Sequence, residues 1–136
     1  MLGGSGADFL DGQAGDDTLA GQGGGDTLVG GTGNDTFQWN AVSDGDDVVS
    51  SVDGFDQMQI TATNGADTVS VGKLGPRIQV TSGGNVLTIN ASIHVVTIDL
   101  GAGDDLLTVG DLSGVAQTVL TINEIGRASC RERVWR

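Results

Sequence analysis

The chain of 136 residues is acidic, with 18 Asp and Glu against 6 Lys and Arg, a formal net charge of −12 and a pI near 4.1. This charge disfavours nucleic-acid backbones and anionic membrane surfaces as partners and favours cations. Gly accounts for 24 residues, which predicts many tight turns and argues against a helical bundle. No apolar run approaches the roughly 18 residues of a membrane span, so no membrane anchor is expected.

Residues 3–38 consist of four consecutive nine-residue units, GGSGADFLD, GQAGDDTLA, GQGGGDTLV and GGTGNDTFQ. Each unit has Gly at its first and fourth places, Asp at its sixth and a large apolar residue at its eighth. Trp39, Asn40 and Ala41 interrupt the frame, and two degenerate units, VSDGDDVVS and SVDGFDQMQ, then continue it over residues 42–59. The periodicity predicts a first structural segment at residues 1–59.

This pattern resembles the GGxGxDxUx repeat of the RTX, or haemolysin-type, calcium-binding family. The resemblance is close over residues 3–38 and partial to residue 59. It implies a β-roll in which each nonad forms a turn from its first six residues and a short strand from its last three, with two nonads in each coil. The expected fold class is all-β, a parallel β-roll of nonapeptide repeats followed by an irregular β-solenoid or β-sandwich segment.

The units contain too little apolar surface to hold such a coil together. Glycines at the turn places permit positive φ and leave the backbone carbonyls uncovered. One buried large side chain contributes roughly 1.5–3 kcal/mol, whereas each of nine ordered residues costs roughly 1–2 kcal/mol of backbone entropy. The side chains expected to point inward are Leu10, Leu19, Leu28, Phe37, Val49 and Met58.

The Asp residues at the sixth place supply the missing stability in this interpretation. With two nonads in each coil, alternate nonads stack at about 4.8 Å and place Asp8 over Asp26 and Asp17 over Asp35. The degenerate units extend both columns by one Asp, although the three-residue interruption leaves these two further pairs open. Facing carboxylates repel, and Ca²⁺, which takes six to eight oxygen ligands, turns the repulsion into attraction. The predicted metal-binding residues are Asp8, Asp17, Asp26, Asp35, Asp47 and Asp56, with the turn residues Gly4, Gly6, Gly15, Gly24, Gly31 and Gly33.

Other interpretations of the repeat fit less well. A flexible Gly-Asp linker has no reason to keep an apolar residue in phase. An EF-hand needs a bidentate Glu, and residues 1–123 contain none. A phosphate-binding loop needs a following GK[ST], which is absent. The irregularly placed Asp11, Asp16 and Asp104 are expected to be solvated turn charges.

Residues 60–123 predict strands rich in Val, Ile and Thr, separated by Gly, Asn and Asp turns. Asp67 and Asp105 occupy the Asp place of two further turns of similar composition. The segment is expected to continue the solenoid or to form an irregular sandwich on the end of the roll, where Trp39 and Phe55 either cap the roll or anchor a loop. The expected strands are 67–71, 77–81, 85–89, 93–100, 106–109 and 117–122.

The sequence gives no support for catalysis, and we expect no enzyme. His94 is the only His, it lies in a strand pattern, and no nucleophile can be tied to it. General acid–base chemistry needs two carboxylates whose environments differ, whereas a regular ladder treats its carboxylates alike.

Residues 124–136, EIGRASCRERVWR, differ in composition and contain four Arg, both Glu and the only Cys. A basic tail that docks on an acidic face is one interpretation. EIGRASCRERV also closely resembles what one reading frame of a widely used short-read sequencing adapter encodes. We therefore expect a non-native tail, a natural sequence interrupted near Asn123, and no role for Cys130.

The expected function is calcium binding that couples folding to extracellular calcium in a secreted or surface bacterial protein. The family resemblance implies type I secretion, and the remainder of a larger secreted protein is expected to be missing. Two alternatives remain: a non-catalytic accessory region of a secreted hydrolase or toxin, and a structural adhesin β-solenoid. Calcium ions are the expected partner and cofactor, and nucleic acid is not.

Overall fold

The computed structural model describes residues 1–115 and 118–123, and this part of the chain is all-β, as predicted. The described residues contain no helix that could cross a membrane. The strands are β1 (Leu2–Ser5), β2 (Phe9–Asp11), β3 (Thr18–Gly23), β4 (Thr27–Val29), β5 (Thr36–Asn40), β6 (Asp47–Ser50), β7 (Gln57–Thr61), β8 (Thr68–Leu74), β9 (Arg77–Ser82), β10 (Asn85–Ile89), β11 (Val95–Asp99), β12 (Leu106–Val109) and β13 (Val119–Asn123).

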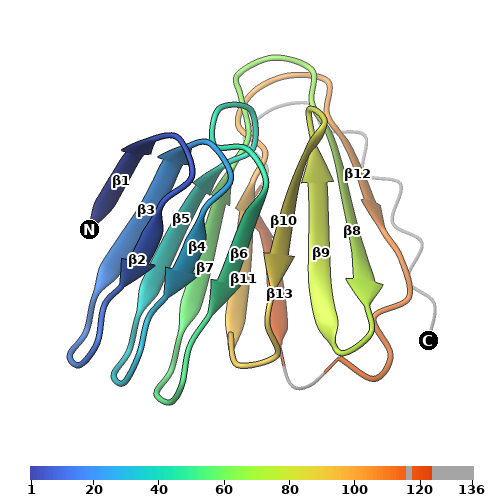
Figure 1. Ribbon diagram of the computed structural model, residues 1–136. Coiled ribbons are helices and arrows are strands. Elements are labelled where there is room, and N and C mark those ends of the chain that lie inside the picture. The colour runs from blue at the N-terminus through green and yellow to red at the C-terminus, as the bar shows by residue number, and fades with distance from the viewer. Residues whose placement is uncertain (116–117, 124–136) are drawn as a thin grey trace.

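The strands form two facing sheets, and the chain passes from one to the other through short turns (Figure 1). Sheet A has the order β1-β3-β5-β7-β11-β13, and sheet B has the order β12-β8-β9-β10-β6-β4-β2. Over the repeats, odd-numbered strands lie in sheet A and even-numbered strands in sheet B. Apart from the antiparallel pairs that β9 makes with β8 and β10, all strand pairs of the described residues are parallel.

The strand register confirms that two nonads make one coil. Leu10 lies opposite Leu28 in sheet B, and Leu19 lies opposite Phe37 in sheet A, so stacked positions are 18 residues apart. The next pair, Leu28 and Val49, is 21 residues apart because the interruption adds three residues without breaking the stack. The six eighth-place side chains are all buried, as predicted.

The interruption at residues 39–41 lengthens β5 and adds to the core. Trp39 is 2% exposed, and its indole N–H donates a hydrogen bond to the carbonyl oxygen of Gly45 at 3.1 Å. Phe55 is 53% exposed and stacks on His94, with ring centroids 5.2 Å apart. Of the two aromatic residues expected at the junction, only Trp39 therefore packs inside.

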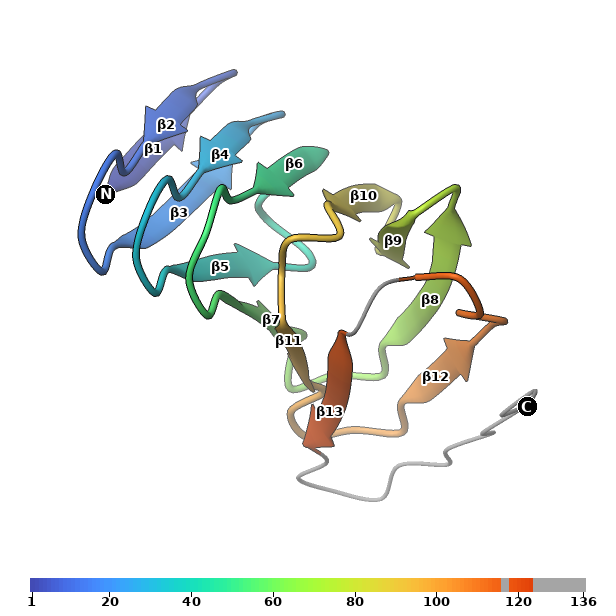
Figure 2. The same ribbon diagram turned by 90° about the horizontal axis from the view of Figure 1, so that it is seen from below.

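The segment after residue 59 continues the solenoid and carries an inserted hairpin. All six expected strands are present, with ends shifted by up to three residues where the structure describes them. β9 runs antiparallel to β8 and β10, and β10 pairs in parallel with β6. Sheet B therefore has two strands between β6 and β8, whereas β7 and β11 are direct neighbours in sheet A. Figure 2 shows that sheet B follows a longer and more curved path than sheet A.

The two expected segments share one pair of sheets. Residue 59, the expected end of the first segment, lies within β7, and both sheets contain strands from either side of it. The buried side chains form one continuous cluster between the sheets, from Leu10 to Leu107. The hairpin strands contribute Ile78, Val80, Leu87 and Ile89 to this cluster, so the core is richer after the repeats than within them.

Candidate metal centre

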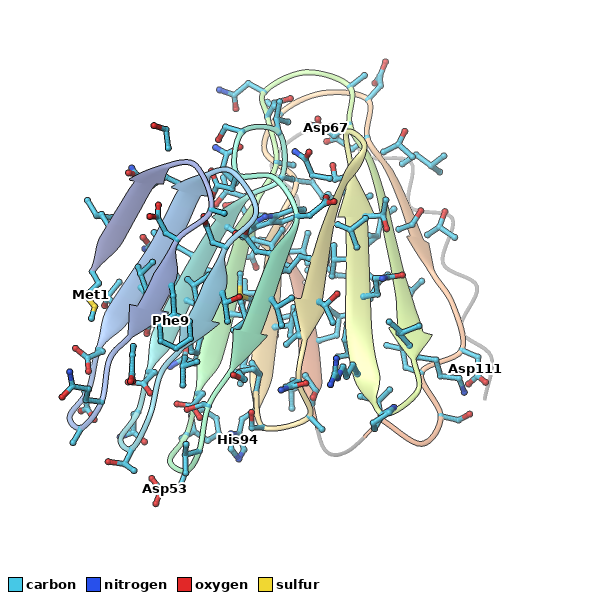
Figure 3. All side chains as sticks on the ribbon, in the orientation of Figure 1. Met1, Phe9, Asp53, Asp67, His94 and Asp111 are labelled. Atoms are coloured by element: carbon cyan, nitrogen blue, oxygen red, sulfur yellow. The ribbon has the colours of Figure 1, made fainter. Side chains whose placement is uncertain are left out.

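The turns between the sheets lie in two rows at opposite edges of the molecule (Figure 1). We call the row that contains the β1–β2, β3–β4 and β5–β6 turns the upper row, and the one with the β2–β3, β4–β5 and β6–β7 turns the lower row. Figure 3 labels Asp67 in the upper row and His94 in the lower row. The predicted ligands divide into an upper column of Asp8, Asp26 and Asp47 and a lower column of Asp17, Asp35 and Asp56.

A backbone-to-carboxylate hydrogen bond joins each Asp of the upper column to the next. The N–H of Asp8 donates to Oδ1 of Asp26 at 2.8 Å, and the N–H of Asp26 donates to Oδ1 of Asp47 at 2.9 Å. The backbone continues the same stack, because Val48 N–H donates to the carbonyl oxygen of Asp26 at 2.9 Å. Asp26 and Asp47 thus each use one carboxylate oxygen to hold the preceding coil.

The lower column repeats this arrangement. Asp17 N–H donates to Oδ1 of Asp35 at 3.0 Å, and Asp35 N–H donates to Oδ1 of Asp56 at 2.8 Å. All four expected stacked pairs are therefore confirmed, including the two that the interruption left open.

The second oxygen of several of these carboxylates is buried without a partner. Oδ2 of Asp8, Asp26 and Asp56 accepts no hydrogen bond, and Oδ2 of Asp35 meets only the Ser51 hydroxyl at 3.4 Å. A buried, unpaired carboxylate oxygen is costly, and it is the type of ligand that a hard cation prefers. The residues present therefore fit calcium, with the Oδ2 atoms as the protein's free anionic ligands.

These carboxylates also lack basic neighbours. Asp26, Asp35, Asp47 and Asp56 are at most 2% exposed, and the one ion pair among the described residues joins Lys73 to Asp111 at 2.9 Å. Burial raises the pKa of Asp47 to about 7, and the charges of Asp26, Asp44 and Asp46 add to the rise, while the hydrogen bond from the Asp26 N–H opposes it. Without a cation, Asp47 is therefore partly protonated at neutral pH.

The turn glycines are required by backbone conformation and by stacking. All six predicted glycines have positive φ. A Cβ on Gly24 would lie 2.0 Å from the carbonyl oxygen of Gly6, and one on Gly33 would lie 2.3 Å from that of Gly15. Adjacent turns consequently approach too closely for any side chain at this place.

The described residues contain no group of three or more His, Cys, Asp or Glu side chains placed to hold one metal ion. A calcium ion bound here would need backbone carbonyl oxygens in addition to carboxylates, as the sequence predicted. Asp11, Asp16 and Asp104 are exposed, as expected. Asp11, however, ends β2 and does not lie in a turn, and Oδ1 of Asp16 accepts a hydrogen bond from the Asn34 N–H at 2.8 Å.

His94 closes the lower column, a role that sequence reasoning did not foresee. It lies one residue before β11, level with Asp56, because Val95 is opposite Gln57. The N–H of Asp56 donates to Nδ1 of His94 at 3.3 Å, so the imidazole accepts the bond that the next Asp would have accepted. The one sequence signal for this role was position: His94 lies two residues before the inward-facing Val96, and each repeat has its Asp two residues before its inward-facing apolar residue.

The upper row contains a further rung outside the repeats. Asp67 N–H donates to Oδ1 of Asp105 at 2.9 Å, and these two residues are 9% and 2% exposed. A Cβ on Gly103 would lie 2.1 Å from the carbonyl oxygen of Gly65, as between the stacked glycines of the repeats. The Asp place recognised in the sequence at Asp67 and Asp105 thus has the same geometry.

Residues 2–37 match the family model described as the RTX calcium-binding nonapeptide repeat, in four copies. No curated protein and no solved structure in the comparison matches the chain. The expected adapter-derived tail, residues 124–136, lies outside the described residues. RTX nonapeptide repeats indicate calcium binding, and the matched residues are those that form the first stacked Asp pairs. Residues 2–37 are thus similar to RTX calcium-binding nonapeptide repeats.

Proposed function

We propose that calcium binding drives folding of the repeat segment, and that Oδ2 atoms of the two Asp columns supply its anionic ligands. The observation that carries this proposal is the set of buried Oδ2 atoms without a partner in Asp8, Asp26 and Asp56. In the absence of a cation, burial of these carboxylates opposes folding, because each charge loses its hydration without gaining a counter-charge. A bound cation reverses the sign of this contribution, so that binding free energy becomes folding free energy.

We further propose an extracellular location, on the surface of a bacterium or in its secretions, and no catalytic activity. Extracellular calcium sites have dissociation constants of about 10⁻⁴ to 10⁻³ M, and millimolar calcium then contributes at most about 1.4 kcal/mol for each site. A thin core with several weak sites would remain unfolded at low cytosolic calcium and fold outside. The uninterrupted sheets also suit a structural rod, as in an adhesin.

Far-UV circular dichroism of the full chain, from chelator to several millimolar calcium with magnesium as a control, tests the proposal. We expect strand content to rise with calcium. The Asp26→Asn variant keeps the size of the side chain and alters the middle carboxylate of the upper column, so its calcium midpoint should rise several-fold and its cooperativity should fall. Asp104→Asn, in an exposed turn, is the matched control and should behave as wild type.

Two outcomes contradict the proposal. One is equal strand content in chelator and in calcium. The other is an Asp26→Asn midpoint and cooperativity that match those of Asp104→Asn, which would show that the Asp columns do not bind the ion.

A further inference from the structure

The turn that contains Asp67 differs from the repeat turns in the partners of its carboxylate. In both kinds of turn, the backbone N–H of one Asp donates to Oδ1 of the Asp in the next coil, as Asp67 does to Asp105 and Asp26 does to Asp47. At Asp67, however, Oδ2 accepts hydrogen bonds from the backbone N–H of Thr63 at 2.9 Å and from its hydroxyl at 2.7 Å. The corresponding Oδ2 of Asp26 has no hydrogen-bond partner.

The hydroxyl of Thr63 is held in position to donate. The N–H of Gly65 donates to Oγ1 of Thr63 at 3.0 Å, so the oxygen accepts one bond and directs its own proton to Asp67. Counted back from Asp67 at the sixth place, Thr63 is at the second place, where the four regular nonads have residues with positive φ, such as Gly4 and Gly31. Thr63 has an ordinary φ.

The Asp67 turn therefore has its hydrogen-bonding requirement met by the protein. Two donors on one carboxylate oxygen stabilise its negative charge. A bound cation would stabilise the charge of an otherwise unpaired oxygen in the same way. Val69 and Val71 of the following strand are buried among the side chains of the hairpin, so this coil also has more apolar support than a repeat coil.

We infer that Thr63 takes, in the Asp67 turn, the place that calcium takes in the repeat turns, so that the coil formed by β7, β8, β11 and β12 folds without metal. The inference rests on the proposed function, since it contrasts this coil with calcium-dependent coils. Thr63 is a positioning residue that decides whether a turn of this type needs an ion.

Amide hydrogen exchange of the full chain, followed by NMR in chelator and in millimolar calcium, tests the inference with two equivalent pairs of reporters. The N–H groups of Asp67 and Leu106 bond to Oδ1 of Asp105 and to the carbonyl oxygen of Asp67. Those of Asp26 and Val48 make the same two bonds in the repeats. In chelator we expect protection at Asp67 and Leu106 and fast exchange at the repeat pair.

Three variants test the role of the hydroxyl. Thr63→Ala should lower the protection of the Asp67 and Leu106 amides in chelator by roughly tenfold or more, because a hydrogen bond to a charged group is lost. Thr63→Ser keeps the hydroxyl and should retain protection. Thr61→Ala removes a neighbouring exposed hydroxyl from β7 and should match wild type.

The outcomes separate this inference from the proposed function. If the wild-type amides of both Asp67 and Asp26 lose protection in chelator, the inference is overturned, whereas calcium-driven folding of the repeats still stands. This result comes from the wild-type protein and so does not depend on whether a variant folds. Equal protection in Thr63→Ala and Thr63→Ser also overturns it. Protection of Asp26 in chelator instead contradicts the proposed function, and the Ala and Ser variants still report on Thr63.

Discussion

At the residue scale, the sixth-place Asp is both a structural and an ionic group. One oxygen accepts the N–H of the preceding coil, as Asp47 Oδ1 does from Asp26, and this bond needs no metal. The other oxygen is buried, and in Asp26 it has no partner. The same side chain consequently stabilises the register of the stack and, without a cation, opposes its formation.

The raised pKa of Asp47 predicts how the calcium-free protein responds to pH. Asp47 has a pKa of about 7 in the fold and the ordinary 3.8 of an exposed Asp when unfolded. Between these values the folded chain holds a proton that the unfolded chain has lost, so the Asp47 contribution to stability is full below pH 4 and disappears as the pH rises to about 7. In chelator the repeats should therefore gain strand content, measured by far-UV circular dichroism, as the pH falls from 7.5 to 4.5, and Asp47→Asn should reduce this gain.

Asp111→Asn is the matched control for that measurement. The backbone N–H of Ser113, and then Lys73, lower the pKa of Asp111 to about 2, so its contribution is present above pH 4 and is lost only in stronger acid. Its removal should leave the gain in strand content between pH 7.5 and pH 4.5 as it is in wild type. A gain in strand content in Asp47→Asn equal to that of wild type would contradict the prediction.

The sequence correctly predicted the positions of single residues wherever the nine-residue period applies. It placed the six Asp residues in two columns and the eighth-place side chains in the core, because a solenoid translates a sequence period directly into position. It could not assign Thr63 or His94. Their roles depend on hydrogen bonds to Asp67 and Asp56, and whether those bonds form is decided by turn conformation and by the coil stacked beside them.

At the scale of elements, the stacked turns are held by close backbone contact. The fourth-place glycines of the upper row lie directly over one another, and a Cβ on Gly45 would lie 1.9 Å from the carbonyl oxygen of Gly24. Strand spacing in a parallel stack is about 4.8 Å, which leaves no room for side chains between successive turns. Gly is therefore required at the fourth place of the repeat for two reasons: it permits positive φ, and it has no side chain to collide with the neighbouring turn.

Substitution of Gly24 by Ala tests this contact. Gly24→Ala combines a left-handed backbone conformation with a collision against Gly6, and we expect the free energy of unfolding in calcium to fall by more than about 2 kcal/mol. Gly6→Ala has the same backbone conformation with open space around it, so it should lose only about 1–2 kcal/mol. Urea denaturation measures both.

Gly72→Ala completes the set as a control, since Gly72 lies in β8 with an ordinary φ and no atom within 4 Å of its added Cβ. It should leave stability unchanged or raise it slightly. Equal losses in Gly24→Ala and Gly6→Ala would show that stacking contributes nothing beyond backbone strain.

The inserted hairpin shows the limit of sequence reasoning about elements. Its strands β9 and β10 were expected within two residues of their ends, and Gly83 and Gly84 between them have the positive φ values of a tight hairpin turn. Local patterning could not reveal that β10 would pair with β6, because alternating apolar residues define a strand's faces and leave its neighbours open.

At the scale of the whole molecule, charge opposes the calcium-free fold. The chain has a formal net charge of −12, and the described residues contain a single ion pair, between Lys73 and Asp111. Added salt therefore screens far more repulsion than attraction. In chelator, raising NaCl from 20 mM to 500 mM should raise the thermal midpoint, because the screening length falls to a few ångströms.

Calorimetry or circular dichroism at several NaCl concentrations checks this prediction. With saturating calcium the same increase in NaCl should have a smaller effect or a destabilising one, because the ion already compensates the columns and salt weakens its attraction. A thermal midpoint in chelator that falls with NaCl would contradict the prediction.

The sequence alone determined the all-β class, the two-nonad coil and the two Asp columns, because in a stacked repeat each residue type recurs at one position in space. Only the tertiary structure decided that β10 joins β6, that both segments share one pair of sheets, that Thr63 donates to Asp67, and that His94 accepts from Asp56. These features depend on contacts between residues about 4 to 40 positions apart that no period relates, so they follow from packing.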